Sequence, residues 1–473
     1  MEARAPESPA QPFRFGSGGW RGILGEDLSF AQLRELLRAV ASWVGGLARG
    51  PRVVVAHDTR FQSARMAEIA IGVLQSQGLE PWSAPGPIPT PVAGHAVRRL
   101  RAAAGVVLTA SHNPPEYHGL KLLGPSGASI GSAECRAIER LGLALRPHFA
   151  CPRELPRRAA RDFAGAYARD LAALLDRAAL RRSGLGVWYD AMHGTGARVL
   201  PALLLRAGLR VRALRGGADP HFGGGAPDPV PARLRALSRL LRRQAGLRLG
   251  VATDGDADRF ALLDAGGRVL SESESLALIV DHLAQRGALG PGVALSTATG
   301  SLAERVARAH GVRVTRPGMG FRRLSEELAS GRCALAGDES GGIAWSRLGC
   351  EKDGMLGAAL GIEIVAIRRA PLGERLRELE RRHGRTAWAR TAIVARPARR
   401  EQLDKLLANP PERLEGHRVR DFDCADGVRL GFEDGFLLLR ASGTEPVLRL
   451  YAEAASPAAL RARLRAGVGL LPG

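Results

Sequence analysis

Lysine is almost absent from this chain. Of its 68 lysine and arginine residues only Lys121, Lys352 and Lys405 are lysines, so arginine carries the formal net charge of +21. Such an excess can indicate a nucleic-acid-binding protein. Here, however, the arginines are spread along most of the sequence, and aromatic residues, which single-strand-binding surfaces need, make up only 5% of it. We therefore expect no nucleic-acid partner, and we expect the positive field to attract small anionic molecules.

Cysteines and long apolar runs are also scarce. The five cysteines form no Cys-x-x-Cys pair and have no nearby histidine at zinc-binding spacing, which excludes a zinc ribbon. No run of about 18 apolar residues is present, and residues 1–12 are polar and rich in alanine and proline. These absences predict a soluble, cytoplasmic protein with reduced cysteines and no membrane partner.

Length and pattern predict a multidomain α/β protein. A chain of 473 residues, 45% of them hydrophobic, is too long for one core and should form three or four domains. Apolar strands alternate with polar loops and helices up to about residue 385, and strands predominate beyond it. The expected domains are residues 1–155, 156–268, 269–385 and 386–473. Among the expected helices are residues 29–48, with Ser29 as N-cap, and residues 162–180.

The first informative loop is TASHNPP at residues 109–115, which follows the apolar run 105–108. A buried strand that ends in a polar loop is typical of the edge at which open α/β sheets place their chemistry. We interpret Ser111 as the residue that carries the reacting group. On its own the loop could equally be an ordinary turn stopped by two prolines.

The second loop, DGDADR at residues 254–259, places Asp254, Asp256 and Asp258 at alternate positions after the strand 249–252. Three carboxylates held this close need a cation between them. A calcium loop of the EF-hand type is excluded because its sixth position is Arg259 and its twelfth is Ala265, and because a strand precedes it. Three protein carboxylates suit Mg²⁺, which keeps room for phosphate oxygens and water.

Three further loops could bind a sugar phosphate. In GDESGG at residues 337–342, Asp338 and Ser340 offer an acceptor and a hydroxyl to a polyhydroxy ligand, and Glu339 could assist. In RASGTEP at residues 440–446, an arginine, two hydroxyls and a glycine form an anion-binding loop. The glycine-rich loop 16–22 presents Arg21 to a phosphate. Together these loops indicate phosphoryl transfer to or from a phosphorylated sugar.

The four motifs TASHNP, DGDADR, GDESGG and RASGTEP, in this order and at similar separations, resemble the active-site motifs of the α-D-phosphohexomutases. The resemblance spans residues 16–453, and the loop around Arg21 matches a fifth motif. It implies four domains around a central cleft, three of them similar mixed α/β units and the last a smaller α+β domain. It also implies hexose phosphates as the small-molecule partners, and we expect a monomer or homodimer.

The resemblance further implies residue roles. Ser111 would be a phosphoserine that passes its phosphoryl group to a hexose phosphate through a hexose 1,6-bisphosphate, with glucose 1,6-bisphosphate as activator. One Mg²⁺ would be held by Ser111 and the three aspartates. His112, Lys121, Arg21 and Arg259 would serve the transfer. The remaining expected substrate-binding residues are Asp338, Glu339, Ser340, Arg322, Arg440, Ser442, Gly443 and Thr444.

The sugar loop resembles the phosphoglucomutase and phosphomannomutase type. Phosphoglucosamine mutases usually carry glutamine in place of Glu339 and histidine in place of Gly342, so we expect glucose phosphate as substrate, with mannose phosphate second. Two departures from the family pattern are Asp338, where a longer glutamate is common, and Arg322, where lysine is common. The alternatives are a phosphoglucosamine mutase and an inactive family member acting as a binding protein.

Overall fold

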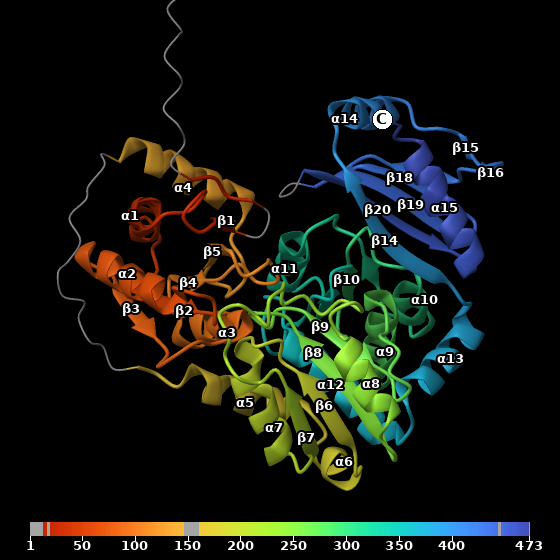
Figure 1. Cartoon of the computed structure of the whole chain (residues 1–473), viewed down its shortest axis with the longest axis horizontal. Coiled ribbons are helices and arrows are strands. Elements are labelled where there is room, and N and C mark those ends of the chain that lie inside the picture. Colours follow the sequence, from red (N-terminus) through yellow and green to blue (C-terminus); the bar gives the residue numbers. More distant parts are fainter. Residues whose placement is uncertain (1–12, 17–18, 146–159, 443–445, 473) are drawn as a thin grey trace, which may run out of the picture.

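The structure is a computed structural model that describes residues 13–16, 19–145, 160–442 and 446–472. It contains three α/β units and a C-terminal sheet domain (Figure 1). This confirms the predicted fold class of three mixed α/β units followed by a smaller α+β domain.

The first unit is built on a five-stranded sheet in the order β1-β5-β4-β2-β3. Strands β2, β3 and β4 are parallel, whereas β5 is antiparallel to β4 and β1 is antiparallel to β5. Helices α1, α2 and α4 share an apolar core with one face of the sheet, and α3 packs on the other. The elements are β1 (Trp20–Ile23), α1 (Phe30–Gly45), β2 (Arg52–His57), α2 (Ser63–Ser76), β3 (Glu80–Ser83), α3 (Thr90–Leu100), β4 (Ala104–Leu108), β5 (Tyr117–Leu123) and α4 (Ser132–Ala144).

The second and third units repeat this plan. Their sheets have the orders β7-β6-β8-β9 and β11-β10-β12-β13, each with three parallel strands and an antiparallel fourth. The second unit comprises α5 (Phe163–Leu174), α6 (Arg177–Arg182), β6 (Gly186–Asp190), the 3₁₀ helix η1 (Thr195–Arg198), α7 (Leu200–Arg206), β7 (Arg210–Leu214), α8 (Arg235–Arg242), β8 (Arg248–Thr253) and β9 (Phe260–Leu263). The third comprises α9 (Glu272–Gln285), β10 (Val293–Leu295), α10 (Leu302–Ala309), β11 (Val314–Thr315), α11 (Phe321–Ala329), β12 (Leu335–Gly337), β13 (Ile343–Trp345), α12 (Gly354–Arg368) and α13 (Leu372–His383).

Three of the predicted loops occupy the same place in this repeated plan. Each joins the third parallel strand to the antiparallel fourth: residues 109–116 between β4 and β5, residues 254–259 between β8 and β9, and residues 338–342 between β12 and β13. In each sheet the second parallel strand lies on one side of the first, and the third lies on the other side. This reversal of direction is the switch point at which α/β sheets bind ligands, and each loop begins beside it, at the carboxyl end of the third strand.

The C-terminal domain is an antiparallel sheet in the order β14-β20-β19-β18-β17. One face packs under α14 and α15, and the other packs Phe436, Leu438 and Tyr451 against the third unit. Its elements are β14 (Ala387–Val394), α14 (Pro397–Ala408), β15 (Arg413–Leu414), β16 (His417–Arg418), β17 (Asp421–Asp423), β18 (Val428–Phe432), β19 (Gly435–Ala441), β20 (Val447–Ala454) and α15 (Pro457–Gly469).

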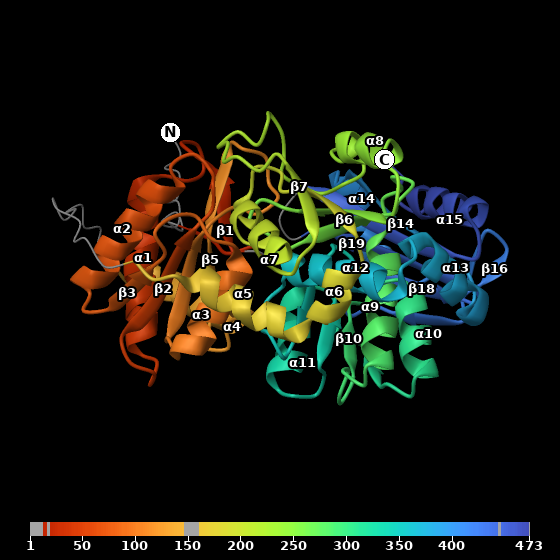
Figure 2. The ribbon, with the colours of Figure 1, turned by 90° about the horizontal axis from the view of Figure 1, so that it is seen from below.

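The largest apolar core is continuous through the first three units. Its centre is α12, a helix buried along nearly its whole length and packed on β8, β9 and α9. In Figure 2 the first sheet and the C-terminal sheet lie at opposite ends of the molecule, with α6, α7 and α12 between them. This shared core brings loops from separate units to one place.

Most expected elements form, and Ser29 does cap α1 with a capping box completed by Gln32. Two expectations were wrong. The single helix expected at residues 162–180 is two helices, because Leu175 is extended and Asp176 begins a new helix by accepting from Ala179 N. The loop expected at residues 16–22 overlaps a strand, because Arg21 belongs to β1 and pairs with Gly119 of β5.

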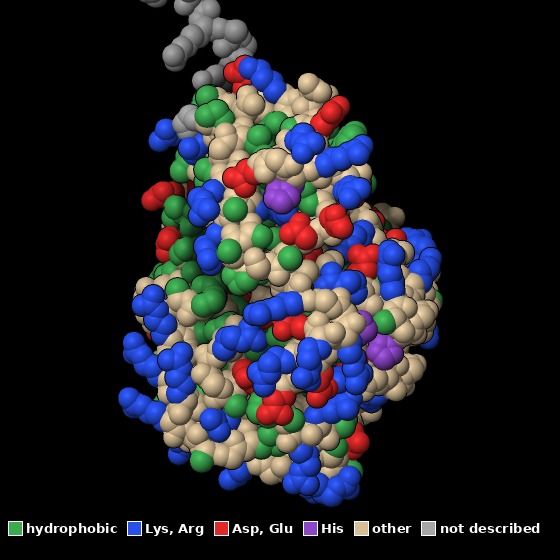
Figure 3. All heavy atoms as spheres, turned by 90° about the vertical axis from the view of Figure 1, so that its right-hand side faces the viewer, with side chains coloured by type: hydrophobic (Ala, Val, Ile, Leu, Met, Phe, Trp, Pro, Cys, Tyr) green, Lys and Arg blue, Asp and Glu red, His purple; other side chains and the backbone are tan. Residues whose placement is uncertain are grey.

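Basic side chains are scattered over the face shown in Figure 3, with acidic side chains among them. No helix in the described part of the chain is long and apolar enough to cross a membrane. Four cysteines are described and all are free thiols, whereas Cys151 lies outside the described residues.

Candidate active site

Ser111 projects from the loop after β4 toward the second unit. Its hydroxyl donates to Asp254 Oδ2 at 2.8 Å, and its own N–H donates to Thr109 Oγ1 at 2.8 Å. Its backbone is left-handed, with φ of 54°, a conformation that costs free energy in a residue other than glycine and that clusters at functional sites. The protein thus holds a strained serine with its oxygen against an aspartate that is 143 residues away in the sequence.

Asp254, Asp256 and Asp258 converge as the sequence predicts. They are fully buried, and one carboxylate oxygen from each lies within 4.8 Å of the other two. A tight turn with Ala257 in the left-handed region forms the loop, and Arg259 N donates to Asp254 Oδ1 at 3.0 Å. From the first unit, Thr90 Oγ1 donates to Asp256 Oδ2 at 2.5 Å, so two units shape the cluster.

Two of the chain's three lysines reach this cluster. Lys121 Nζ, from β5, lies 2.6 Å from Asp256 Oδ2 and 2.5 Å from Asp258 Oδ2. Lys352 Nζ, from the segment before α12, lies 3.2 Å from Asp258 Oδ2. Because of these charges and Arg259, the pKa of Asp258 lies well below its usual range even though burial raises it.

The cluster fits a divalent cation. Oδ1 of Asp256 and Oδ1 of Asp258 are buried and accept no hydrogen bond from any residue that the structure describes. Burial, reinforced by the charges of Asp258 and Asp256, raises the pKa of Asp254 well above its usual range. The charge of Asp254 is therefore the one that the neighbouring cations stabilise least, and the three aspartates could bind a metal ion.

His112 and Arg21 lie beside the serine. His112 Nδ1 is 3.4 Å from Ser111 Oγ, and Arg21 Nη1 donates to Asn113 Oδ1 at 2.6 Å. Burial, together with the positive charges of Arg259 and Arg21, lowers the pKa of His112 well below its usual range. The imidazole is thus neutral at physiological pH, and its Nδ1 lies beside the Ser111 hydroxyl.

The loop at residues 338–342 is organised by Asp338. Its Oδ1 accepts from Ser340 N at 2.9 Å, Ser340 Oγ at 2.8 Å and Gly342 N at 2.8 Å. Glu339 is buried and accepts from Ser296 Oγ of the neighbouring switch-point loop. Phe260 N donates to Gly341 O at 3.1 Å, which ties this loop to the end of the aspartate loop.

The remaining predicted residues lie in the third unit and the C-terminal domain. Arg322, in the first turn of α11, donates from Nη1 to Ser132 Oγ of the first unit. Arg440 lies near the end of β19 directly opposite Arg449 of β20, an arrangement of like charges that an anion would stabilise. Ser442 N donates to Val447 O at 2.9 Å, whereas Gly443 and Thr444 lie outside the described residues.

The structure adds site residues for which the sequence prompted no role. Lys352 and Thr90 touch the aspartates, and Arg60 contacts the serine loop. The scarcity of lysine is a signal that could have pointed to Lys352, because the described chain places Lys405 on a surface helix and the other two lysines in the cluster. No local pattern marks Thr90 or Arg60.

Four domain models of one enzyme family match consecutive parts of the chain between residues 13 and 468. The family descriptions matched are those of phosphoglucomutase/phosphomannomutase α/β/α domains I, II and III, at residues 13–144, 165–267 and 271–383, and of its C-terminal domain, at residues 392–468. The chain belongs to the phosphoglucomutase/phosphomannomutase family of phosphohexomutases.

Relatives support this assignment. A phosphoglucomutase/phosphomannomutase from Thermococcus kodakarensis is 31% identical over 97% of this chain and 98% of its own length. A phosphoglucosamine mutase from Cereibacter sphaeroides is 30% identical over 94% of this chain and 96% of its own. The crystal structure of a candidate phosphomannomutase from Thermus thermophilus superimposes with a TM-score of 0.86 at 33% identity and covers 98% of this chain and 99% of its own.

Proposed function

We propose that this protein interconverts hexose 1-phosphates and hexose 6-phosphates by passing a phosphoryl group through Ser111. The observation that carries the proposal is the contact between Ser111 Oγ and Asp254 Oδ2, 2.8 Å across two units, at the edge of a buried aspartate cluster. A serine placed against a cation site suits phosphoryl transfer, in which positioning and charge neutralisation supply most of the catalysis.

The proposed reaction needs no co-substrate. Starting from phosphorylated Ser111, the bond from phosphorus to Oγ breaks as a bond from phosphorus to the free sugar hydroxyl forms, and the hydroxyl proton passes to a neighbouring base. The bound hexose 1,6-bisphosphate then reverses its orientation. Its other phosphate ester breaks, the phosphoryl group returns to Oγ, and the released sugar oxygen takes up the proton. His112, neutral and 3.4 Å from Oγ, is the proposed proton carrier.

Asp254, Asp256 and Asp258 would hold one Mg²⁺, with an oxygen of the phosphorylated Ser111 as a further ligand. The ion would neutralise charge on the transferring group. Lys121, Lys352, Arg21 and Arg259 add positive charge around the same point.

Substrate binding is assigned to the other two loops. Asp338 and Ser340 would hold sugar hydroxyls, and Arg440 and Ser442 would hold the phosphate that does not react, with Gly443 and Thr444 completing that loop. We propose that Glu339 does not contact the sugar but supports the sugar loop by accepting from Ser296, because the Glu339 side chain is buried. Arg322 is assigned to the rim of the site because it already spans the first and third units.

We propose glucose phosphate as the preferred substrate, with mannose phosphate second, on the ground of Glu339 and Gly342 in the sugar loop. Phosphoglucosamine mutase is a second candidate because several relatives carry that name at about 30% identity.

The experiment is a comparison of kcat/KM for the 1-phosphates of glucose, mannose and glucosamine, with catalytic hexose 1,6-bisphosphate and Mg²⁺. The proposal predicts the highest value for glucose 1-phosphate and loss of activity in excess chelator that Mg²⁺ restores. Preference for glucosamine 1-phosphate would overturn the substrate assignment, and turnover undiminished by chelator would overturn the metal site.

A further inference from the structure

Arg60 donates hydrogen bonds to the backbone of the serine loop, residues 109–116. Residues 58–60 follow β2, whose carboxyl end adjoins that of β4 in the first sheet. The Arg60 side chain is buried, and its two terminal nitrogens donate to four backbone carbonyls, three in the loop and one at the first residue of β5. The acceptors are Ser111 O at 2.7 Å, Asn113 O at 2.6 Å, Pro114 O at 2.7 Å and Tyr117 O at 3.0 Å.

The loop needs this donor. Pro114 and Pro115 have no N–H, so little of the loop's backbone can satisfy its own carbonyls by internal hydrogen bonds. Pro114 O also accepts from Tyr117 N at 3.1 Å, whereas the buried Ser111 O, left without the Arg60 donor, would cost about 1–3 kcal/mol. A guanidinium with five N–H groups in a planar fork can donate to four carbonyls from one side chain.

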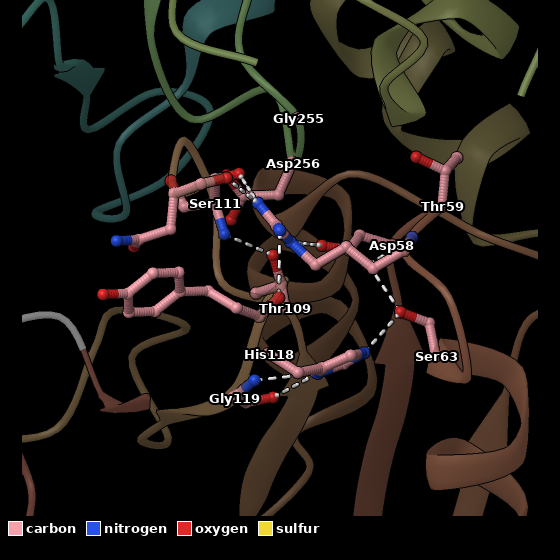
Figure 4. Close-up of polar contacts among 12 residues, drawn as sticks. Asp58, Thr59, Ser63, Thr109, Ser111, His118, Gly119, Gly255 and Asp256 are labelled. Carbon is pink, nitrogen blue, oxygen red and sulfur yellow. Dashed lines mark hydrogen bonds and ion pairs between the residues drawn. The ribbon is translucent and has the colours of Figure 1, made fainter. Parts of the chain in front are cut away.

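The guanidinium itself contacts Asp58 and the ring of Phe222. Asp58 Oδ2 lies 3.2 Å from Arg60 Nε, and Asp58 Oδ1 accepts from Arg60 N at 2.9 Å and from Ser63 Oγ at 2.5 Å. Ser63 Oγ in turn contacts His118 Nε2 of β5 at 2.9 Å. The ring of Phe222, from the second unit, lies 4.8 Å from the Arg60 guanidinium carbon. Figure 4 shows Asp58, Ser63 and His118 on one side of the Ser111 loop and Gly255 on the other.

The carbonyl of Ser111 is closed in on its second side by Gly255 of the aspartate loop. A Cβ added to Gly255 would lie 2.7 Å from Ser111 O, so the two loops pack backbone to backbone. Fixing the Ser111 carbonyl also fixes the direction of the next N–H, that of His112, because the two groups of a trans peptide point in opposite directions. The hydrogen bond from Arg60 to the Ser111 carbonyl therefore constrains the residue whose backbone is left-handed.

We propose that the Asp58–Arg60 ion pair is a positioning element of the phosphotransfer site, which holds the strained Ser111 so that its oxygen faces the aspartate cluster. Neither side chain touches Ser111 Oγ or the aspartates in any contact of the described residues. The pair thus acts through the nucleophile's backbone. The inference rests on the proposed role of Ser111.

The test is steady-state kinetics of Arg60→Lys with glucose 1-phosphate. Lysine keeps the charge but has three donors and no planar fork, so it cannot reach all four carbonyls. We expect kcat to fall about 100-fold, the cost of a displacement of about 1 Å at the reacting atom, with KM within about threefold of the wild type. The rate at which hexose 1,6-bisphosphate phosphorylates Ser111, followed by intact-protein mass spectrometry, should fall with kcat.

Arg463→Lys is the matched control. Arg463 is also buried, donates to a backbone carbonyl, pairs with Asp434 at 2.7 Å and lies 4.3 Å from a phenylalanine ring, but it belongs to the C-terminal domain. The Arg463→Lys variant should lose thermal stability while its kcat stays at the wild-type value. A kcat for Arg60→Lys above half the wild-type value, or equal relative losses of kcat in the two variants, would overturn the proposal.

Asp58→Asn decides the question if Arg60→Lys does not fold. Asparagine keeps the oxygen that accepts from Arg60 N and Ser63, and it replaces the charged oxygen beside Arg60 Nε with an uncharged NH2 group that cannot accept. The proposal predicts about a tenfold lower kcat with an unchanged KM, because the guanidinium loses its orienting charge. An unchanged kcat would contradict it. If the wild type showed no mutase activity and Ser111 took up no phosphate, the proposed function itself would fail, which is a different outcome.

Discussion

Replacing Lys121 by methionine removes the positive charge that neutralises the aspartate cluster most directly. The ammonium group lies 2.6 Å from Asp256 and 2.5 Å from Asp258, all three side chains are buried, and methionine has similar length and no charge. In the absence of divalent cations the variant leaves the buried carboxylates with the positive charges of Lys352, Arg259 and Arg21.

The expected loss of stability is large. Removing one partner of a buried ion pair typically costs about 3–5 kcal/mol, because the other charge stays buried and uncompensated. The retained contact of Lys352 with Asp258 should keep the loss at the lower end of that range. A cation that binds only the folded state adds about 2.7 kcal/mol at a hundred times its dissociation constant, so Mg²⁺ should offset most of the loss.

The assay is urea unfolding followed by circular dichroism, with chelator and with Mg²⁺. We expect Mg²⁺ to stabilise Lys121→Met more than it stabilises the wild type. Lys405→Met is the control, because Lys405 is 65% exposed, pairs with Glu401 at 2.9 Å and should change stability by less than about 1 kcal/mol. Losses for Lys121→Met and Lys405→Met that are equal within error, or an equal Mg²⁺ effect on the variant and the wild type, would refute this account of the cluster.

Two further predictions concern other parts of the chain. Arg440→Ala should lower kcat/KM about 10- to 1000-fold for 1-phosphate and 6-phosphate sugars alike, because a charge-assisted contact is worth roughly 1.5–3 kcal/mol or more when its partner is left buried. The Mg²⁺ affinity, measured by calorimetry, should stay near the wild-type value. Loss of Mg²⁺ binding with normal sugar affinity would contradict the assignment. Burial raises the pKa of Asp353, which accepts from Tyr167 Oη at 2.6 Å, to about 6. Its folded pKa is above its unfolded pKa, so its stabilising contribution is complete below about pH 4 and is lost as the pH rises through 6. Asp353→Asn, which can still cap α12, should therefore be more stable than the wild type by about 1–3 kcal/mol at pH 7.5. At pH 4 the variant should lose that advantage. A difference in urea unfolding that does not depend on pH would show the assignment to be wrong.

Local sequence could predict the strands, the loops and the chemistry within each loop. Asp254, Asp256 and Asp258 converge because they alternate in one short turn, and Ser111 is exposed to the site because its loop ends a buried strand. The break between α5 and α6 could also have been predicted from the sequence, since Asp176 is a good N-cap.

Contacts between distant segments could not be predicted in this way. Thr90 reaches Asp256 across 166 residues, Arg60 reaches the Ser111 carbonyl across 51, and Arg322 reaches Ser132 across 190. None of these pairs carries a local pattern. The Thr90–Asp256 and Arg322–Ser132 contacts depend on how one unit packs against another, whereas the Arg60–Ser111 contact depends on how β2 and β4 lie side by side in the first sheet. Glu339 faces Ser296 because β10 and β12, which these residues follow, are neighbours in the third sheet.

The most direct test of the account is to locate the phosphate on the protein. Wild type and Ser111→Ala are incubated with hexose 1,6-bisphosphate and Mg²⁺, digested, and sequenced by tandem mass spectrometry, with mutase activity measured on the same samples. We predict phosphate on Ser111 in the wild type, none in the variant, and loss of nearly all activity in a variant that folds normally. Phosphate on another residue, or a variant that keeps a tenth or more of the wild-type kcat, would contradict the central claim that Ser111 carries the transferred group.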